Sequence, residues 1–413
     1  MGNFWEKYTS SNLIFRIALG LILGTCLGHF VPQAPVIDQL GILFVGALKA
    51  IAPVLVFVLV SSSLLGSGGG KSRKQIGTVI FLYILSTLVS ASVAVAVSFA
   101  FPVTVPLSLT EQASGVAPTG ISQVFSNLLV SIVTNPVKSL VEANYLGILF
   151  WAVMFGLAMN VFATPSVANG MRQIADSVSQ IVRWIIQLAP FGIMGIVFTS
   201  VSSNGVGIFV NYGKLLAVLV GCMLFVAFVV TPLIVGVTMR SNPFPLVLAC
   251  YKKSGLTAFF TRSSAANIPV NMEIFENLGL NRNLYSVSLP LGATINMNGA
   301  AITITVMTLA TVNTLGLTVD VPTAIILSLL ATAGACGASG VAGGSLLLIP
   351  MACSLFGISN DLAMQVVGIG FIIGVIQDSF ETALNSSTDV IYAAASEFRQ
   401  WKMEGRSLKD ITF

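Results

Sequence analysis

Long, uninterrupted apolar runs constrain this chain more than any other feature. Runs of about 20 apolar residues recur along the whole sequence, and each of them, as a helix, would cross a hydrocarbon core of about 30 Å. In lipid only helices and closed barrels satisfy all backbone hydrogen bonds, and these runs are continuous rather than alternating. Charged residues make up 8% of the 413 residues, whereas soluble domains carry roughly 25%. We therefore predict an all-α membrane protein that forms a single integral membrane domain over residues 1–413.

The spacing of the runs predicts about eight transmembrane helices and two shorter pieces of a different kind. The eight runs lie near 11–31, 37–65, 76–101, 125–163, 174–203, 210–240, 284–312 and 360–396. The shorter pieces, near 243–276 and 321–358, contain the stretches "TRSSAANIP" (261–269) and "GACGASGVAGGS" (334–345). Irregular backbone at membrane depth is tolerated only where it is buried in protein or lines a cavity. Both pieces are therefore predicted to be re-entrant helical hairpins with these stretches at their tips.

The same order of elements occurs twice, which indicates inverted repeats. Each hairpin precedes a span with an Asn-containing break, "TINMNGA" (294–300) in one case and "TALNSST" (382–388) in the other. Paired, interrupted hydrophobic segments of this kind point to a transport site near the middle of the membrane. A passive ion channel is the alternative, because polar stripes and re-entrant loops also occur in channels.

The distribution of lysine and arginine predicts that both termini are cytoplasmic, in a multi-pass protein of the cell (inner) membrane. Cytoplasmic loops carry an excess of these residues. Lys138 and Lys214 fall on the outer side in this arrangement. The basic residues that fall inside are Lys71, Arg73, Lys74, Arg172, Arg183, Arg240, Lys252, Lys253, Arg282, Arg399, Lys402, Arg406 and Lys409.

Several classes of function are disfavoured by the composition. The net charge of +4 comes from residues near the ends of the runs, so it does not predict a nucleic-acid partner. The five cysteines have no metal-site spacing, and His29 is the only histidine. The sequence contains no Walker loop, GxSxG or HExxH motif and no evident nucleophile–base pair, so we do not expect an enzyme.

The last run carries three acids in the stretch "IQDSFETALNSSTDV" (376–390). Acids inside a membrane cost about 2.5–3.5 kcal/mol each on insertion scales, and they usually mark a substrate or ion path. Solvation among headgroups at the end of a run is the alternative, but the apolar sequence "VIYAAA" follows the last acid. Helical spacing of i, i+3, i+4, i+7 and i+11 places five polar residues on one stripe: Asp378, Glu381, Thr382, Asn385 and Asp389.

Two further features add to this polar set. Thr294, Asn296 and Asn298 interrupt an apolar span, and the Asn and Gly residues there favour a local unwinding that frees carbonyl oxygens. Free carbonyls with one or two carboxylates suit a hard cation such as Na⁺, whereas hydrogen bonding between helices is the other use for such Asn side chains. Arg262 lies in the first hairpin tip, and Asp378 is its natural partner at membrane depth.

Four stretches resemble the motifs of one family. "TRSSAANIP", "GATINMNGA", "GASGVAGGS" and "DSFETALNSSTD" are similar, in this order, to the first hairpin tip, the unwound span, the second hairpin tip and the last span of dicarboxylate/amino acid:cation symporters. The resemblance covers nearly the whole chain and is strongest to the sodium:serine/threonine branch of bacteria. It implies the glutamate-transporter fold and a homotrimer with an elevator motion. In that motion a scaffold (roughly 11–65 and 125–203) would hold a moving transport unit (roughly 76–101 and 210–396).

The resemblance also implies which residues bind substrate and sodium. Asp378 would bind the substrate ammonium, and Asn385 with Ser264 would bind the α-carboxylate. The implied substrate contacts are Arg262, Ser263, Ser264, Ala300, Val341, Asp378, Glu381, Thr382 and Asn385. The implied Na⁺ ligands, mostly backbone carbonyls, belong to Gly292, Thr294, Asn296, Asn298, Ala335, Cys336, Ala338, Asn385 and Asp389.

One departure from the family pattern bears on the substrate. Glu381 stands where members that carry acidic substrates have Arg. It would repel a substrate carboxylate, but it could accept a hydrogen bond from a small neutral side chain with a hydroxyl. We therefore expect Na⁺-coupled symport of L-serine and L-threonine, with another small neutral amino acid as the alternative. A pairing of Glu381 with Arg262 is the competing role for this acid.

A second departure bears on the number of coupled ions. Asn298 replaces an Asp that, in some members, contributes to a third sodium site with residues of the third span. The corresponding third-span residues here are Tyr83, Ser86 and Thr87. Because the carboxylate is lost, we expect fewer coupled sodium ions than in the members that carry acidic substrates.

Overall fold

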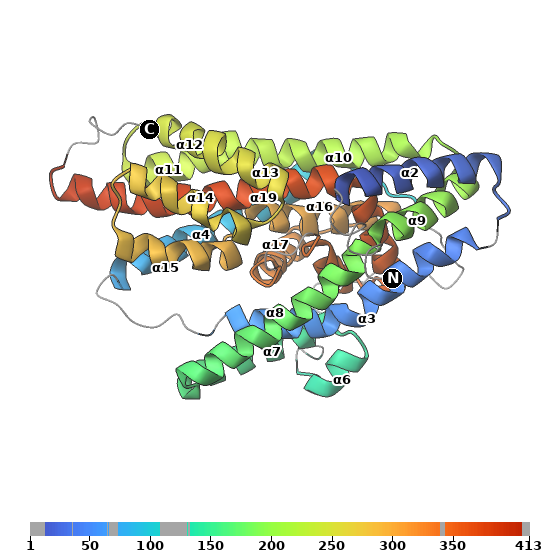
Figure 1. Cartoon of the computed structure of the whole chain (residues 1–413), viewed down its shortest axis with the longest axis horizontal. Coiled ribbons are helices and arrows are strands. Elements are labelled where there is room, and N and C mark those ends of the chain that lie inside the picture. The colour runs from blue at the N-terminus through green and yellow to red at the C-terminus, as the bar shows by residue number, and fades with distance from the viewer. Residues whose placement is uncertain are drawn as a thin grey trace, which may run out of the picture.

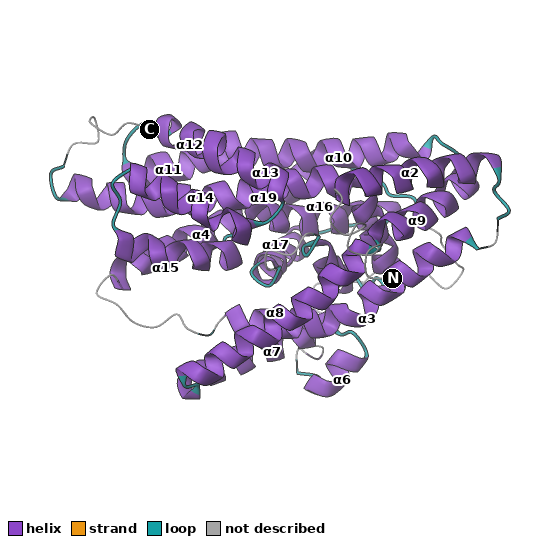
Figure 2. Cartoon of the chain, viewed as in Figure 1, coloured by secondary structure: helices purple, strands orange, loops and turns teal. Residues whose placement is uncertain are grey.

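The computed structural model describes residues 13–34, 36–63, 65, 73–107, 130, 133–338 and 343–406. Every regular element in this part of the chain is a helix (Figure 2). Five of these helical segments are long and apolar enough to cross a membrane, and one bent pair of helices makes a sixth span. The prediction of an all-α membrane protein is confirmed.

The spans follow the predicted positions closely. The five long ones are α3 (Ile37–Ser63), α4 (Arg73–Ala100), α10 to α11 (Ile208–Phe225 and Thr231–Met239, joined by the π-helical turn η1, Val226–Val230), α15 to α16 (Arg282–Ile295 and Asn298–Thr314), and α19 (Asn360–Met403). The bent pair is α8 (Pro165–Gln187) and α9 (Ala189–Asn204). Two shorter apolar helices, α2 (Leu13–Phe30) and α7 (Tyr145–Phe162), occupy the remaining positions. A short helix, α6 (Pro136–Val141), precedes α7.

Two predicted spans differ from the observed helices. The predicted straight span over 174–203 is bent by 54° between α8 and α9. Pro190 follows the bend, and its ring and missing N–H are incompatible with a continuous helix. The predicted span over 125–163 is shortened, because the side chain of Asn144 caps α7 just before Tyr145.

The helices α2, α3, α7, α8 and α9 pack mainly against one another. Glycines make their contacts close. A Cβ atom at Gly20 or Gly24 of α2 would lie 2.2 or 2.5 Å from a carbonyl oxygen of α9, and one at Gly195 of α9 would lie 2.3 Å from a backbone nitrogen of α3. In lipid, helices associate through close packing rather than through the hydrophobic effect, so small residues favour this seam.

A second group of helices surrounds α19. It consists of α4, α10, α11, α15 and α16 together with the two hairpins, and α19 contacts each of these elements. In Figure 1, α10, α16 and α19 lie along the long axis of the molecule, whereas α3, α7 and α8 run obliquely below them. α19 is therefore the central helix of this second group.

Both predicted hairpins consist of short helices on either side of a reversal. The first contains α12 (Phe244–Cys250), the π-helical turn η2 (Tyr251–Gly255), α13 (Leu256–Thr261) and α14 (Ser264–Asn277). It reverses at Arg262, which has a left-handed φ of 50°, and Ser263, whose hydroxyl caps α14. The second contains α17 (Val321–Ala335), the 3₁₀ turn η3 (Leu346–Leu348) and α18 (Ile349–Ser354).

The two groups meet mainly through the second hairpin and α19. α18 packs on α7, η3 packs on α3, and α19 packs on α3 and α9. A Cβ atom at Gly337, beside the second tip, would lie 2.4 Å from the side chain of Val60 on α3. Lys49 of α3 forms an ion pair with Asp361 at the start of α19. The main contacts of the first hairpin, by contrast, stay within the second group.

Candidate functional site

The predicted polar stripe lies on α19, which runs without a break past all five residues. The acids are therefore not solvated at the end of a run. Buried polar groups must be hydrogen-bonded or paired, so each side chain needs partners from neighbouring elements. The exposed fractions are 5% for Asp378, 6% for Glu381, 7% for Thr382, 4% for Asn385 and 1% for Asp389.

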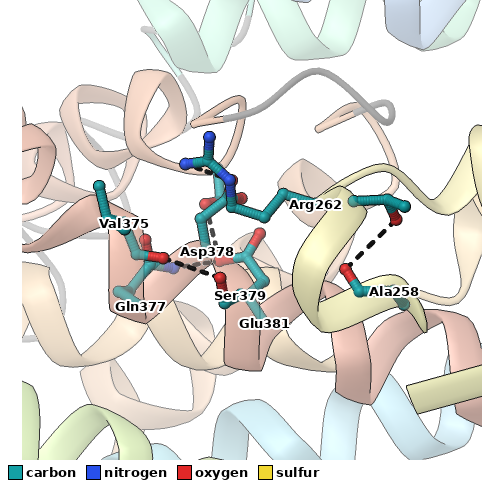
Figure 3. A network of polar contacts seen from close by, with 9 residues as sticks. Ala258, Arg262, Val375, Gln377, Asp378, Ser379 and Glu381 are labelled. Atoms are coloured by element: carbon teal, nitrogen blue, oxygen red, sulfur yellow. Dashed lines mark hydrogen bonds and ion pairs between the residues drawn. The ribbon is translucent and has the colours of Figure 1, made fainter. Parts of the chain in front are cut away.

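Arg262 reaches from the first hairpin tip to Asp378 (Figure 3), as the sequence predicted. Its Nη1 lies 3.9 Å from Oδ2 of Asp378, and its backbone N–H donates to the carbonyl of Ala258 at 2.8 Å. The Arg262 side chain is 12% exposed. No ion pair joins Arg262 to Glu381 among the described residues, so the competing pairing is not present in this structure.

Glu381 is held instead by three neutral donors from three elements. Its Oε2 accepts hydrogen bonds from Thr303 Oγ1 of α16 at 2.7 Å and from Ser345 Oγ at 2.9 Å. The third donor is Nε2 of Gln377, one turn earlier on α19 (Figure 3). These bonds compensate the buried acid without a salt bridge and fix its position one turn after Asp378.

Asn385 joins α19 to the start of α16. Its Oδ1 accepts the backbone N–H of Gly299 at 2.7 Å. A Cβ atom at Gly299 would lie 2.8 Å from the Cα atom of Glu381, so glycine is required for this approach. Ala300 is fully buried beside it. The structure therefore brings Ala300, Glu381 and Asn385, all predicted substrate contacts, to one place.

The predicted unwinding between α15 and α16 is present. α15 ends at Ile295 and α16 begins at Asn298. No backbone N–H of the described residues donates to the carbonyl of Asn296, which leaves this oxygen available to a cation. The carbonyl of Gly292, by contrast, accepts the N–H of Asn296 at 2.9 Å. Thr294, also predicted as a ligand, lies in the last turn of α15.

Asp389 lies directly beside the unwound segment. Its Oδ1 accepts a hydrogen bond from Asn296 Nδ2 at 2.8 Å, which is the one side-chain bond to this carboxylate in the described part of the chain. A Cβ atom at Gly292 would lie 2.7 Å from the same oxygen. A buried carboxylate with a single neutral donor lacks compensation, and a bound cation would supply it.

Asn296 and Asn298 also hydrogen-bond between helices. Both amide nitrogens donate to Thr388 Oγ1 of α19, at 2.8 and 3.0 Å. From α4, Ser86 donates to Oδ1 of Asn296 and Ser90 donates to Oδ1 of Asn298, each at 3.3 Å. The alternative use for these Asn side chains is therefore present next to the freed carbonyl, and the two uses are compatible.

The third-span residues predicted around a further sodium ion lie together on α4. Tyr83, Ser86 and Thr87 are each at most 1% exposed. The hydroxyls of Ser86 and Thr87 donate to the carbonyl of Tyr83, and the Tyr83 hydroxyl donates to the carbonyl of Asp389 at 2.9 Å. These groups are neutral, as is Asn298, so the place offers a cation no carboxylate of its own.

The second hairpin tip contacts the unwound segment. Cys336 Sγ donates to the carbonyl of Ile295 at 3.5 Å. The carbonyl of Ala335, a predicted sodium ligand, accepts the N–H of Ala338 at 2.9 Å. Ala338 is therefore near the same tip, whereas the predicted substrate contact Val341 lies outside the described residues.

The first hairpin is fixed to α19 by a buried network that sequence reasoning missed. Asn267 Nδ2 donates to Ser254 Oγ at 2.9 Å and to Ser386 Oγ at 2.8 Å, and Asn271 Nδ2 donates to the carbonyl of Ser386 at 3.2 Å. All four residues are fully buried. The network anchors α14, whose first residue, the predicted substrate contact Ser264, is 4% exposed.

Sequence reasoning also missed the residues that hold Glu381. Gln377 carried a signal, since it lies four residues before Glu381 and thus on the same face of α19. Thr303 is four residues after Gly299, so it lies on the face of α16 that meets α19. Ser345 carried no such signal, because its position depends on how the second hairpin folds back.

Comparison with known proteins decides the family. Residues 13–397 match the sequence profile of the sodium:dicarboxylate symporter family. The chain belongs to this family. As a member of a transporter family it is a multi-pass membrane protein and not an enzyme, which confirms those predictions, and the family match also confirms the resemblance of the four motifs.

Curated relatives within the sodium:dicarboxylate symporter family match over nearly their full length. The chain is 57% identical over 403 residues to the serine/threonine transporter SstT of Bifidobacterium adolescentis, and this alignment covers 98% of this chain and 93% of that protein. It is 59% identical over 398 residues to SstT of Streptococcus agalactiae (96% and 98%) and 54% identical over 402 residues to SstT of Streptococcus thermophilus (97% and 100%).

Proposed function

We propose that this chain couples the uptake of L-serine and L-threonine to the entry of sodium. The observation that carries the proposal is the setting of Glu381, a buried acid of the polar stripe, one turn after Asp378, that three neutral donors hold in place. The relatives named serine/threonine transporters, at 54–59% identity, support the same substrates.

The stripe offers complementary groups for a small zwitterion. Asp378 would accept a hydrogen bond from the substrate ammonium. In the structure Arg262 Nη1 lies 3.9 Å from Oδ2 of Asp378, a long ion pair that the ammonium would replace. Asn385, with the N-terminus of α14 at Ser264, would bind the α-carboxylate, because helix N-termini present free N–H groups and a partial positive charge.

Glu381 would accept a hydrogen bond from the substrate hydroxyl. A carboxylate on the substrate side chain would instead meet a like charge, which costs several kcal/mol in a desolvated site. This argument favours hydroxy amino acids over aspartate and glutamate, although the family is named for dicarboxylates.

Sodium would be the co-transported ion, bound at the unwound segment. The carboxylate of Asp389 and the free carbonyl of Asn296 are oxygen ligands of the kind that hard cations prefer. Thr294 and Asn385 lie beside them, and the carbonyls near Ala335, Cys336 and Ala338 would contribute to a second ion. The neutral residue Asn298 supports fewer coupled ions than an Asp would.

Transport would proceed as an elevator. The scaffold (roughly 11–65 and 125–203) would stay fixed while the transport unit (roughly 76–101 and 210–396) slides against it. Two features support this division: each helix group packs mainly against itself, and the groups meet through a limited surface at the second hairpin and α19. Because the main contacts of the first hairpin lie outside the scaffold, the structure would correspond to one end of the motion.

The assembly and orientation follow from the same proposal. We place the protein in the cell (inner) membrane as a homotrimer formed by the scaffold helices, with both termini in the cytoplasm. The basic residues at alternate connections support this orientation.

Uptake of labelled L-serine into proteoliposomes tests the proposal. An inward sodium gradient should drive accumulation above equilibrium, and a matched potassium gradient should not. Equal uptake under both conditions would refute coupling. Sodium current in the absence of serine would instead favour a passive channel.

A further inference from the structure

A cavity of about 340 Å³ lies within the second helix group, and none of the five residues of the polar stripe lines it. It lies between α10 with η1, the first arm of the first hairpin, and α19. This volume falls within the range of small-molecule pockets, roughly 300–1,000 Å³. Its lining residues include Phe228, Lys252, Leu256, Phe259, Phe380 and Ala383.

The walls of the cavity are mostly apolar, and aromatic side chains from neighbouring elements pack against each other along them. Phe259 of the hairpin packs against Phe380 of α19 with ring centroids 5.2 Å apart, and Phe228 of η1 packs against Tyr251 of η2 at 5.5 Å. Both π-helical turns of the described chain, η1 and η2, border this one cavity. Single π-turns inside α-helices occur frequently at functional sites.

The mouth of the cavity lies on a face that is apolar and exposed. Along the first hairpin, Leu248, Leu256 and Phe260 are 52%, 59% and 68% exposed, and Leu233 on the neighbouring α11 is 64% exposed. In a membrane protein such a face meets lipid chains. An acyl chain is therefore the ligand that this surface would encounter at high concentration.

Lys252 is the exception on this face. It lies between Leu248 and Leu256 at helical spacing, and it lines the cavity. It comes eight residues after Phe244, about 12 Å along the hairpin at 1.5 Å per residue. No described residue forms an ion pair with Lys252 or with its neighbour Lys253. A cation at such a position needs either a path to water or an anion.

We propose that this cavity binds an anionic phospholipid, with one acyl chain inside it and the phosphate at Lys252. Basic pockets between membrane helices on the cytoplasmic side suit the headgroups of anionic lipids. The bound chain contacts Ala383 on α19, two residues before Asn385. The lipid therefore supports the helix that carries the polar stripe, and its binding does not depend on which substrate the protein transports.

Native mass spectrometry of the purified full-length protein tests this site. The protein is equilibrated with equal amounts of phosphatidylglycerol and phosphatidylcholine, and the lipid retained on it is counted. The parent protein should retain phosphatidylglycerol preferentially. Lys252→Gln should lower that retention about fivefold, the effect of one lysine near a lipid phosphate, and Ala383→Phe, which fills the cavity, should lower retention of both lipids.

Lys214→Gln changes a lysine of α10 that does not line the cavity, so it is the control and should bind lipid like the parent. Lys252 is on the surface, so its variant should elute as folded protein in size-exclusion chromatography. Equal retention of both lipids by the parent, or unchanged phosphatidylglycerol binding in Lys252→Gln, would overturn the proposal.

Discussion

The two ends of the polar stripe on α19 stabilise a buried acid in different ways. At one end, three neutral donors reach Glu381. At the other end, Asp389 receives one side-chain hydrogen bond, from Asn296, and lies beside a free carbonyl. The acids are similarly buried, at 6% and 1% exposure. The difference supports the proposal that the protein completes the surroundings of Glu381 itself, whereas a bound sodium ion would complete those of Asp389.

A glycine lies beside each of these two acids. Gly299 lets the start of α16 approach the backbone of Glu381, and Gly292 lets α15 approach the carboxylate of Asp389. At the Glu381 end the close neighbours include two backbone atoms of Glu381, its Cα and its carbonyl oxygen, which cannot move aside without moving the helix. At the Asp389 end the closest neighbours are the ends of the Asp389 and Tyr83 side chains, which the proposed sodium ion would also approach.

The largest effect is expected from Asp389→Asn. The substitution removes the charge that would pair with sodium, and breaking a buried ion pair costs about 3–5 kcal/mol, which corresponds to a loss of sodium affinity of roughly 150- to 5,000-fold. Sodium titration of serine binding measures it. Glu397→Gln, on the same helix and outside the stripe, is the control and should leave sodium dependence unchanged. A sodium affinity within threefold of the parent in Asp389→Asn would contradict the ligand assignment.

Glu381→Arg, at the other end of the stripe, should change the substrate preference from serine to aspartate. An Arg at this position would attract a substrate side-chain carboxylate, so aspartate binding should appear while serine binding falls at least tenfold, the equivalent of about 1.4 kcal/mol. Glu381→Gln keeps the shape without the charge and should weaken serine binding without any gain of aspartate. Competition assays against labelled serine report both outcomes. If neither variant alters the ratio of serine to aspartate affinity, Glu381 does not set selectivity.

Gly299→Ala and Gly292→Ala probe the two ends with one added methyl group. Overpacking costs about 1–3 kcal/mol. Because its neighbours include backbone atoms of α19, Gly299→Ala should lower thermal stability and serine affinity together, while Gly292→Ala should mainly lower sodium affinity. Gly221→Ala, where the added atom meets nothing within 4 Å, is the control. Thermal unfolding combined with sodium and serine titrations separates these effects. If Gly299→Ala and Gly292→Ala changed thermal stability, serine affinity and sodium affinity to the same extent, the two ends of the stripe would not differ in function.

The smallest effect is expected from Thr303→Val. It removes one of three donors to Glu381, at a cost of about 1.5–3 kcal/mol for a hydrogen bond to a charged group, part of which Ser345 and Gln377 offset. Serine affinity should fall by less than tenfold. Asn296→Ala, which removes the single donor to Asp389, should change sodium affinity by more than Thr303→Val changes serine affinity. The opposite ranking would show that the number of donors does not distinguish the two sites.

Much of the fold could be predicted because the constraints were local. The lengths of the apolar runs located the spans, and the Gly, Ser and Asn stretches located the hairpin tips and the break before Asn298. Helical periodicity alone placed Asp378 through Asp389 on one stripe. The cost of an unpaired charge in the membrane was enough to predict that Arg262 and Asp378 would meet.

The features that were missed depend on long-range packing. The bend at Pro190 and the shortened span before Tyr145 are exceptions, because Pro190, Asn135–Pro136 and Asn144 are local signals of a helix boundary. The donors Thr303 and Ser345 are 78 and 36 residues away from Glu381 in the sequence. Such distances leave no trace in local periodicity. The roles of the site residues in binding remain predictions that the variants above test.

The central claim is that the two ends of the stripe bind serine and sodium and are coupled through α19 and the unwound segment. Linkage then requires that each ligand raise the affinity for the other by the same factor. Isothermal titration of serine at several sodium concentrations, and of sodium at several serine concentrations, measures both factors on one protein sample. The account predicts equal factors of tenfold or more, which Asp389→Asn abolishes; serine affinity that does not change with sodium concentration would contradict it.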